Sequence, residues 1–264
     1  LDPKVKWRAY YQRRNGSKYN NLVALSTYGK IVRGIATGDN DYFTFDEKKK
    51  KEFGIPDTCL LPCITKATHA DASFFTQDDF DDLRHKGKRV FLLNAAEAAY
   101  PAVLEYIALG EKREVNTRYL TSHRTPWFAL ENRPPAPILV TVFNRNGLRF
   151  VRNEAGVRNL TCFHSFYINM LAMHRLDVLM AYLITDVSRE ICNDDRREYG
   201  GGLKKFEPND LNQAKALDLE IIDPHTENMI VHVYNEYRAS VLRHRPDRRL
   251  HEKLNDLFFR LLVR

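Results

Sequence analysis

Hydrophobic and polar residues alternate in several short stretches of the first 160 residues, which is the pattern of half-buried strands. Strands are therefore predicted over residues 88–94, 127–131, 137–143 and 148–152. The sequence NRNG at 144–147 predicts a hairpin between the last two, and NEAG at 153–156 predicts a further turn. Residues 21–45 are expected to form two strands around the polar turn in IVRGIATGDNDYFTF, which spans residues 31–45.

Helical spacing replaces this alternation in four segments. Residues 76–86 predict a short helix with acids in its first turns and Gly87 after its end, and residues 101–112 predict another that begins at Pro101. The strongest pattern lies in 166–192, a predicted core helix with apolar residues at i+3 and i+4 spacing: Leu176, Leu179, Met180, Leu183, Val187 and Ile191. A final helix over 226–243 is expected to break at Pro246 and to resume to residue 264.

Strands mixed with helix pairs, without regular βαβ alternation, favour an α+β fold of mixed, mostly antiparallel strands with packed helices and a helical C-terminal tail. We assign residues 1–225 to one domain and residues 226–264 to a helical segment packed on it. The first residue is not methionine and no apolar signal region follows it, so we expect a piece of a longer protein.

Composition is that of a globular protein, with 44% hydrophobic residues among 264. No stretch approaches the 18 consecutive apolar residues that a membrane-spanning helix needs. The four cysteines do not have the spacing of a zinc site, so no metal is predicted, and free thiols suit a cytoplasmic protein.

Positive charge is concentrated in three segments. Residues 1–20 hold six Lys or Arg against one acid, residues 141–175 hold five against one, and residues 236–264 hold eight against four. The chain as a whole has a formal net charge of only +7, so the remainder is acidic. Segregated positive charge is what a polyanion-binding surface requires, although arginine-rich solvated surfaces have the same composition.

Sequence motifs of several enzyme classes are absent: the dinucleotide-binding glycine motif, the P-loop, the serine-hydrolase elbow and the HExxH zinc motif. PD at 56–57 and ITK at 64–66 resemble a metal-dependent nuclease, but Ile64 occupies the position of the required acid. The dispersed histidines, His123, His164 and His232, are interpreted as structural. No catalytic residue is predicted in this chain.

Four longer motifs carry a family resemblance. They are RGIATGDNDYF (33–43), YPAVLEYIALGEKREVNTRYLTSHRTPWFALE (100–131), PAPILVTVFNRNGLRFVRNEAGVRNL (135–160) and YGGGLKKFEPNDL (199–211). In this order they resemble the carboxy-terminal target-recognition region of adenine-specific DNA methyltransferases, in the TaqI-like and combined restriction–modification branch. The resemblance runs from about residue 30 to residue 215.

The resemblance implies a protein in two halves, of which this chain is the DNA-reading one. The family's glycine-rich loop for S-adenosylmethionine and its Asn-Pro-Pro-Tyr-type motif are missing, and NRPPAP at 132–137 is no substitute. We therefore expect no cofactor in this chain, S-adenosylmethionine in the parent enzyme, an upstream methyltransferase domain in the same polypeptide, and double-stranded DNA as the partner. An N6-adenine methyltransferase must also flip the base out of the duplex.

Candidate DNA-binding residues follow from the resemblance and from the charge. In the loop of the first motif, Gly34 and Gly38 would let the backbone approach DNA, while Arg33, Thr37 and Asn40 would supply donors. The other candidates are Lys66, His123, Arg124, Arg145, Arg149, Arg152, Arg158, Lys204 and Lys205. Because Arg149 and Arg152 lie on opposite faces of one strand, we expect at least one of them in a structural ion pair, with Glu154 as a candidate partner.

Two alternatives remain open at this point. One is a nuclease whose acids would be Asp39, Asp57, Asp78 and Asp82. The other is a partner-binding module that uses the basic amphipathic tail 247–264, for which ordinary packing of a terminal helix is the simpler interpretation.

Overall fold

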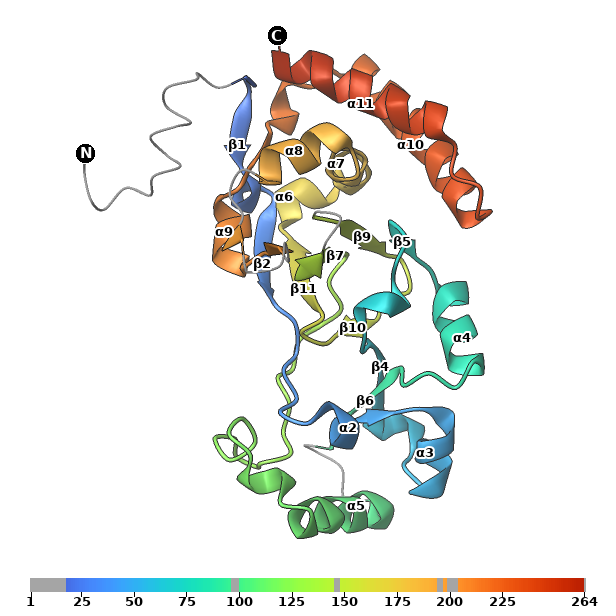
Figure 1. Ribbon diagram of the computed structural model, residues 1–264. Helices are drawn as coiled ribbons and strands as arrows, with labels where there is room; N and C mark the ends of the chain where they lie inside the picture. The colour runs from blue at the N-terminus through green and yellow to red at the C-terminus, as the bar shows by residue number, and fades with distance from the viewer. Residues whose placement is uncertain (1–17, 96–99, 145–147, 194–196, 199–203, 264) are drawn as a thin grey trace, which may run out of the picture.

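A five-stranded sheet runs through the middle of the molecule (Figure 1). The structure, a computed structural model, describes residues 18–95, 100–144, 148–193, 197–198 and 204–263. The sheet has the strand order β2 (Gly29–Arg33), β11 (Phe163–Ile168), β7 (Ile138–Thr141), β9 (Phe150–Asn153) and β5 (Phe74–Phe75). All neighbouring pairs are antiparallel except β5 with β9.

Both faces of this sheet are buried. Because successive side chains of a strand point to opposite sides, neighbouring residues of one strand enter different cores. Ile138 and Val140 of β7 join one hydrophobic cluster, whereas Leu139 between them joins a second. Phe166 and Phe163 of β11 divide between the clusters in the same way. The central sheet therefore separates two cores.

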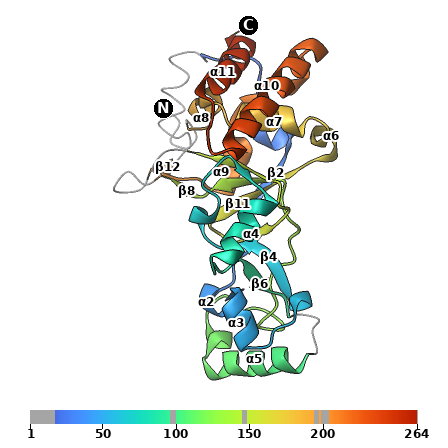
Figure 2. The same ribbon diagram turned by 90° about the vertical axis from the view of Figure 1, so that its right-hand side faces the viewer.

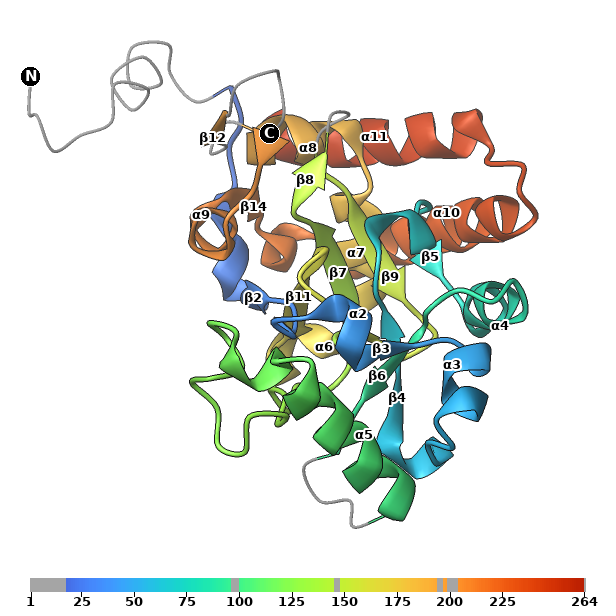
Figure 3. The same cartoon turned by 60° about the horizontal axis from the view of Figure 1, so that its bottom comes forward.

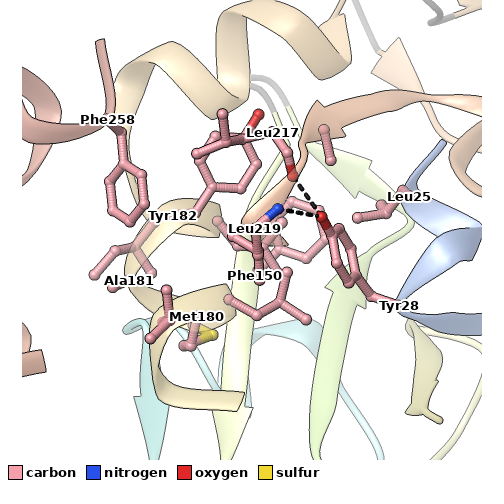
Figure 4. Packing of buried hydrophobic residues seen from close by; sticks show 14 of the residues in the cluster. Leu25, Tyr28, Phe150, Met180, Ala181, Tyr182, Leu217, Leu219 and Phe258 are labelled. Carbon is pink, nitrogen blue, oxygen red and sulfur yellow. Dashed lines mark hydrogen bonds between the residues drawn. The ribbon is translucent and has the colours of Figure 1, made fainter. Parts of the chain in front are cut away.

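The first core lies under the helices at one end of the molecule. These are α6 (Met170–Met173), α7 (Leu176–Leu183), α8 (Asp186–Asn193), α9 (Pro208–Gln213), α10 (Pro224–Leu242) and α11 (Arg248–Val263). A two-stranded sheet of β1 (Leu22–Ala24) and β14 (Lys215–Leu217) lies beside them. Figure 4 shows the interior, where the hydroxyl of Tyr28 donates to the Leu217 carbonyl at 2.6 Å and accepts from the Leu219 N–H at 2.9 Å.

The second core lies toward the other end, where α5 is outermost (Figures 1 and 2). It is built on a four-stranded sheet in the order β10 (Arg158–Asn159), β4 (Leu60–Ile64), β6 (Phe91–Leu93) and β3 (Thr44–Phe45). The helices of this half are α2 (Asn40–Phe43), α3 (Glu47–Glu52), α4 (Gln77–His85) and α5 (Pro101–Lys112).

A small three-stranded sheet stands apart from the central one, in the order β12 (Arg197–Glu198), β13 (Lys204–Lys205) and β8 (Phe143–Asn144). It sets Lys205 opposite Phe143. The hairpin predicted at 144–147 is confirmed by the antiparallel pairing of β7 with β9, although residues 145–147 of its turn lie outside the described residues.

The α+β prediction is confirmed. Helices predicted at 76–86, 101–112, 226–243 and beyond Pro246 correspond to α4, α5, α10 and α11. Thr76 closes the start of α4 with a capping box, and Gly87 follows its end at a φ of 64°. None of the described helices is both long and apolar enough to cross a bilayer.

The predicted second strand of the 21–45 segment is wrong over Asn40–Phe43, which form the short helix α2. Asp39 caps it, since its carboxylate accepts from the Tyr42 N–H at 3.1 Å. Thr44–Phe45 are extended but pair with β6 in the other sheet, so the segment is not a hairpin. The aromatic run predicted a strand. The local pattern does not show that Asp39 caps a helix at this point.

The strand predicted at 127–131 is also wrong, since these residues lie in turns and extended chain without a strand partner among the described residues. Trp127 in this segment packs against the second core: its ring lies 5.6 Å from that of Tyr42, and its indole N–H donates to Glu111 at 3.2 Å.

The single helix predicted over 166–192 is wrong at its start and in its continuity. Phe166–Ile168 belong to β11, and three helices follow, α6, α7 and α8. The residues of the predicted apolar face are buried as expected. Pairing with β2 decides the state of Phe166–Ile168, Phe166 also pairs with β7, and such tertiary pairing overrides local spacing.

Candidate nucleic-acid interface

A cavity of about 480 Å³ lies where β2 ends and the chain turns into α2. Figure 3 shows these two elements next to each other along the chain. Five of the predicted site residues line it, namely Arg33, Thr37, Gly38, Asn40 and Lys205. The remaining wall comes from Ala36, Leu120, Val142, Phe143, Thr161, His164 and Glu207. Segments from five separate parts of the sequence thus meet at one site.

The loop between β2 and α2 is held by its own side chains. The Thr37 hydroxyl accepts from the Asp39 N–H at 3.1 Å and donates to Oδ1 of Asn40 at 2.6 Å. The hydroxyl of Thr44 donates to the Asn40 carbonyl at 2.6 Å. These short-range bonds give the loop one shape before any partner arrives.

Two arginines from the 113–126 segment fasten the same loop from outside. Arg124 donates through Nη1 to the Thr37 carbonyl at 2.8 Å and through Nη2 to the Ala36 carbonyl at 2.5 Å. Arg118 pairs with the Asp39 carboxylate at 2.9 Å. The guanidinium of Arg124, a predicted DNA contact, is therefore engaged in holding the loop.

The two glycines of the loop have different environments. A Cβ on Gly34 would lie 2.3 Å from the Leu160 carbonyl oxygen and 2.5 Å from that of Phe163, so this glycine is required by packing inside the protein. Gly38 is exposed at the cavity and has a φ of 87°, a left-handed conformation that favours glycine.

The opposite wall of the cavity is formed by the pairing of β13 with β8 and by β11. Lys205 forms an ion pair with Glu207 at 2.5 Å, and its Nζ lies 5.7 Å from the centre of the Phe143 ring. His164 is 2% exposed, and its Nε2 bonds the Phe206 carbonyl at 2.7 Å. Burial lowers the pKa of His164 below its ordinary value, so the ring is neutral at pH 7.

Arg33 stands out among these residues because its guanidinium is exposed and makes no hydrogen bond or ion pair within the described part of the chain. Its backbone carbonyl accepts from Nη1 of Arg133 at 2.8 Å, and its register partner on β11 is His164. The backbone of Arg33 is thus fixed while its charged end is free.

Comparison with known proteins assigns a family to this arrangement. Residues 11–245 match the model of the C-terminal domain of Type II methyltransferase M.Eco57I. The chain belongs to this family. It is 51% identical over 244 residues to the Type II methyltransferase M.AccI of Acinetobacter calcoaceticus, covering 92% of this chain and 45% of that protein.

A second relative of this Type II methyltransferase C-terminal domain is M.XamI of Xanthomonas campestris pv. amaranthicola. It is 27% identical over 216 residues, covering 75% of this chain and 37% of the relative. The chain thus spans less than half the length of either curated relative. The predicted resemblance to the C-terminal region of DNA methyltransferases is confirmed at the level of the family.

Solved structures share the fold of this domain. The type IIG restriction endonuclease BpuSI superposes with a TM-score of 0.52 at 13% identity, over 87% of this chain and 28% of that one. The type IIL restriction–modification enzyme MmeI, solved in complex with DNA, superposes with the same score of 0.52 at 12% identity, over 87% of this chain and 32% of its own. At these identities the likeness concerns the fold alone.

Three other predicted arginines of the domain lie away from the cavity in structural contacts. Arg149 donates to the carbonyls of Asp71 and Ala70, and Arg158 donates to the Arg133 carbonyl at 3.0 Å. Arg152 lies 3.7 Å from the Asp177 carboxylate, which confirms the expected structural ion pair. The suggested partner Glu154 is wrong, because it is bound by Arg238 from α10.

The remaining predicted contacts are scattered. Lys66 is exposed after β4, and His123 is exposed with Nδ1 2.6 Å from the Tyr119 carbonyl oxygen. Lys204 belongs to β13, but its side chain is not described, and Arg145 lies outside the described residues.

The acids of the nuclease alternative are dispersed. Asp39 caps α2, Asp57 pairs with Lys50, and Asp78 and Asp82 belong to α4. Among the described residues no three His, Cys, Asp or Glu side chains are grouped as metal ligands.

Sequence reasoning missed the apolar and aromatic part of the cavity, above all Phe143, Leu120 and His164. Phe143 ends a continuous apolar run that also forms buried β7, so hydrophobic pattern alone could not mark it as 49% exposed. Leu120 lies between Arg118 and Arg124 in the sequence, and these two arginines bind the loop. Their contacts bring Leu120 to the cavity.

Proposed function

We propose that this chain is the DNA target-recognition part of a Type II methyltransferase, and that the cavity at the end of β2 contacts duplex DNA. The observation that carries the proposal is the unpaired, exposed guanidinium of Arg33 beside a loop held in one shape by Thr37, Arg118 and Arg124. A fixed loop beside a cation that has no partner within the described residues suits DNA contact, since little ordering remains to be done on binding.

Family membership supports the same proposal, because the relatives are methyltransferases and this chain matches their C-terminal domain. In the proposed parent enzyme, an upstream domain binds S-adenosylmethionine and methylates N6 of adenine. No residue of this chain is assigned to the methyl donor. The role of the present domain is to hold the duplex in register while the target base leaves the stack, a step that costs a few kcal/mol.

Duplex binding by the purified chain tests the proposal. Fluorescence anisotropy with short duplexes of randomised sequence should show binding that weakens as salt is raised. Arg33→Ala should lower the affinity and reduce the slope of log K against log salt by about one. The melting temperature should hardly change, because the Arg33 guanidinium has no partner in the described part of the protein.

Arg243→Ala is the matched control. Arg243 is an exposed arginine at the C-terminal end of α10, so the variant loses the same charge at a site remote from the cavity. Equal losses in the two variants would contradict a specific role for the cavity. Magnesium-dependent cutting of the duplex would favour the nuclease alternative, and absence of duplex binding would remove the proposal.

A further inference from the structure

The polar groups around the cavity differ in whether their hydrogen-bonding capacity is already used. Thr37 is engaged at both ends of its hydroxyl, and the Glu207 carboxylate, the negatively charged acceptor in the wall, is paired with Lys205. The Nε2 of His164 is bound to the Phe206 carbonyl. These groups shape the site through bonds already made; Nδ1 of His164 has no partner within the described residues, but it is buried.

Two exposed side chains of the cavity retain donors, and the half-buried Thr161 hydroxyl makes no hydrogen bond within the described residues. One is the guanidinium of Arg33, exposed and unpartnered in the described part of the chain. The other is Asn40: because Thr37 Oγ1 already accepts from the Asp39 N–H, its own proton goes to Oδ1 of Asn40, which leaves the amide Nδ2–H₂ free. Both exposed groups donate, so the exposed edge of the cavity favours an acceptor, which the Thr161 hydroxyl can also bond.

Another part of the wall is apolar. Phe143 is 49% exposed and Leu120 36% exposed, and both line the cavity together with Ala36 and Val142. A phosphate keeps its hydration and gains nothing from such surfaces, whereas the apolar part of a base edge, such as a C5-methyl group, can be desolvated against them.

We infer that the cavity reads the major-groove edge of a guanine, with Arg33 as the specificity-determining residue and Asn40 as a second donor. Guanine presents two adjacent acceptors, N7 and O6, which match the paired donors of a guanidinium. Adenine presents an amino donor beside N7, and cytosine presents a donor, so either would place donor against donor. Thymine offers a single acceptor, O4. This inference rests on the proposed function, and it names the chemistry that the same site would recognise.

Base substitution in a selected duplex tests the inference. Duplexes bound by the wild-type chain are first enriched from a randomised pool, and each guanine of the resulting motif is then replaced by 7-deazaguanine, which pairs normally but lacks the N7 acceptor. At one position this replacement should weaken wild-type binding by roughly 5- to 150-fold. Arg33→Ala should bind the normal and the 7-deaza duplex equally.

Arg33→Lys separates base reading from phosphate contact. Lysine keeps the charge but loses the two-pronged geometry, so the variant should keep most non-specific affinity and lose discrimination at the same guanine. The control Arg243→Ala should retain discrimination at this guanine. If no guanine is sensitive to replacement by 7-deazaguanine, or if Arg33→Lys retains full discrimination, Arg33 contacts a phosphate. The inference then fails while the proposed function stands. Absence of any duplex binding removes both.

Discussion

The guanidinium of Arg124 lies between two carbonyl oxygens of the loop that follows β2, while that of Arg33, at the end of β2, has no partner in the described part of the chain. In sequence, both are arginines beside turn formers and near aromatic residues, and both are predicted DNA contacts. They differ in the hydrogen-bond partners that the fold brings to each guanidinium. A guanidinium bound to buried main-chain carbonyls holds a shape, and an exposed one is available to a ligand.

Arg124→Ala should therefore act differently from Arg33→Ala. Loss of the two charge-assisted bonds to Ala36 and Thr37 should lower the free energy of unfolding by about 1–3 kcal/mol and speed amide hydrogen exchange in residues 34–40. Arg124→Lys should recover only part of the loss, since lysine does not span both carbonyls. Unchanged exchange in both variants would show that the loop does not depend on this side chain.

Helix α2 shows how a single cap decides an element. Asp39 accepts from the Tyr42 N–H and pairs with Arg118, and its side chain is only 10% exposed. At the other end, Nζ of Lys49 donates to the carbonyls of Asp41, Tyr42 and Thr44 at 2.6–2.9 Å. Four residues are too few to be helical alone, so these contacts define α2.

Substitutions at Asp39 separate the cap from the ion pair. Asp39→Ala removes both and should cost about 1–3 kcal/mol of stability, with weaker duplex binding because the loop before α2 loses its end point. Asp39→Asn keeps a cap acceptor and loses the charge opposite Arg118, so it should cost less. Denaturant unfolding of the two variants measures the difference, and equal losses would assign the whole effect to the ion pair.

At the scale of the whole molecule, half-buried His69 and buried His164 make stability depend on pH. Burial, with Lys66 and Lys88 nearby, lowers the pKa of His69 to about 4, and burial also lowers the pKa of His164. Both folded values lie below the ordinary value near 6.5, so the unfolded chain binds more protons as pH falls below that value. Their contribution to stability is present above about pH 6.5 and is lost progressively toward pH 4.

Urea unfolding at pH 7.5 and pH 5 should therefore show lower stability at the acidic pH. His69→Gln should reduce the difference between the two pH values, because glutamine does not titrate. Exposed His232 provides the control, since its side chain is 72% exposed and replacing it should leave the pH dependence unchanged. Identical pH profiles for wild type and His69→Gln would contradict the assignment.

The fold class, helices α4, α5, α10 and α11, and the buried face of α7 and α8 followed from the sequence alone. In each case the signal is local: period and caps such as Thr76 and Pro101 act within a few residues. The family resemblance was likewise visible in ordered motifs. Arg33, Thr37, Gly38 and Asn40 could be grouped because they are neighbours in the chain.

Tertiary structure alone decided which of the predicted cations surround the cavity. Arg149, Arg152 and Arg158 differ from Arg33 in nothing that spacing shows, yet each meets a carbonyl or a carboxylate brought to it by another element. The same holds for Phe166–Ile168, which belong to β11 because all three pair with β2 and Phe166 also pairs with β7. It holds too for Phe143, which is exposed where β8 pairs with β13 instead of the central sheet. Long-range pairing of the elements sets the partner of each side chain. The partner determines whether a charged group is available to a ligand or stabilises the fold.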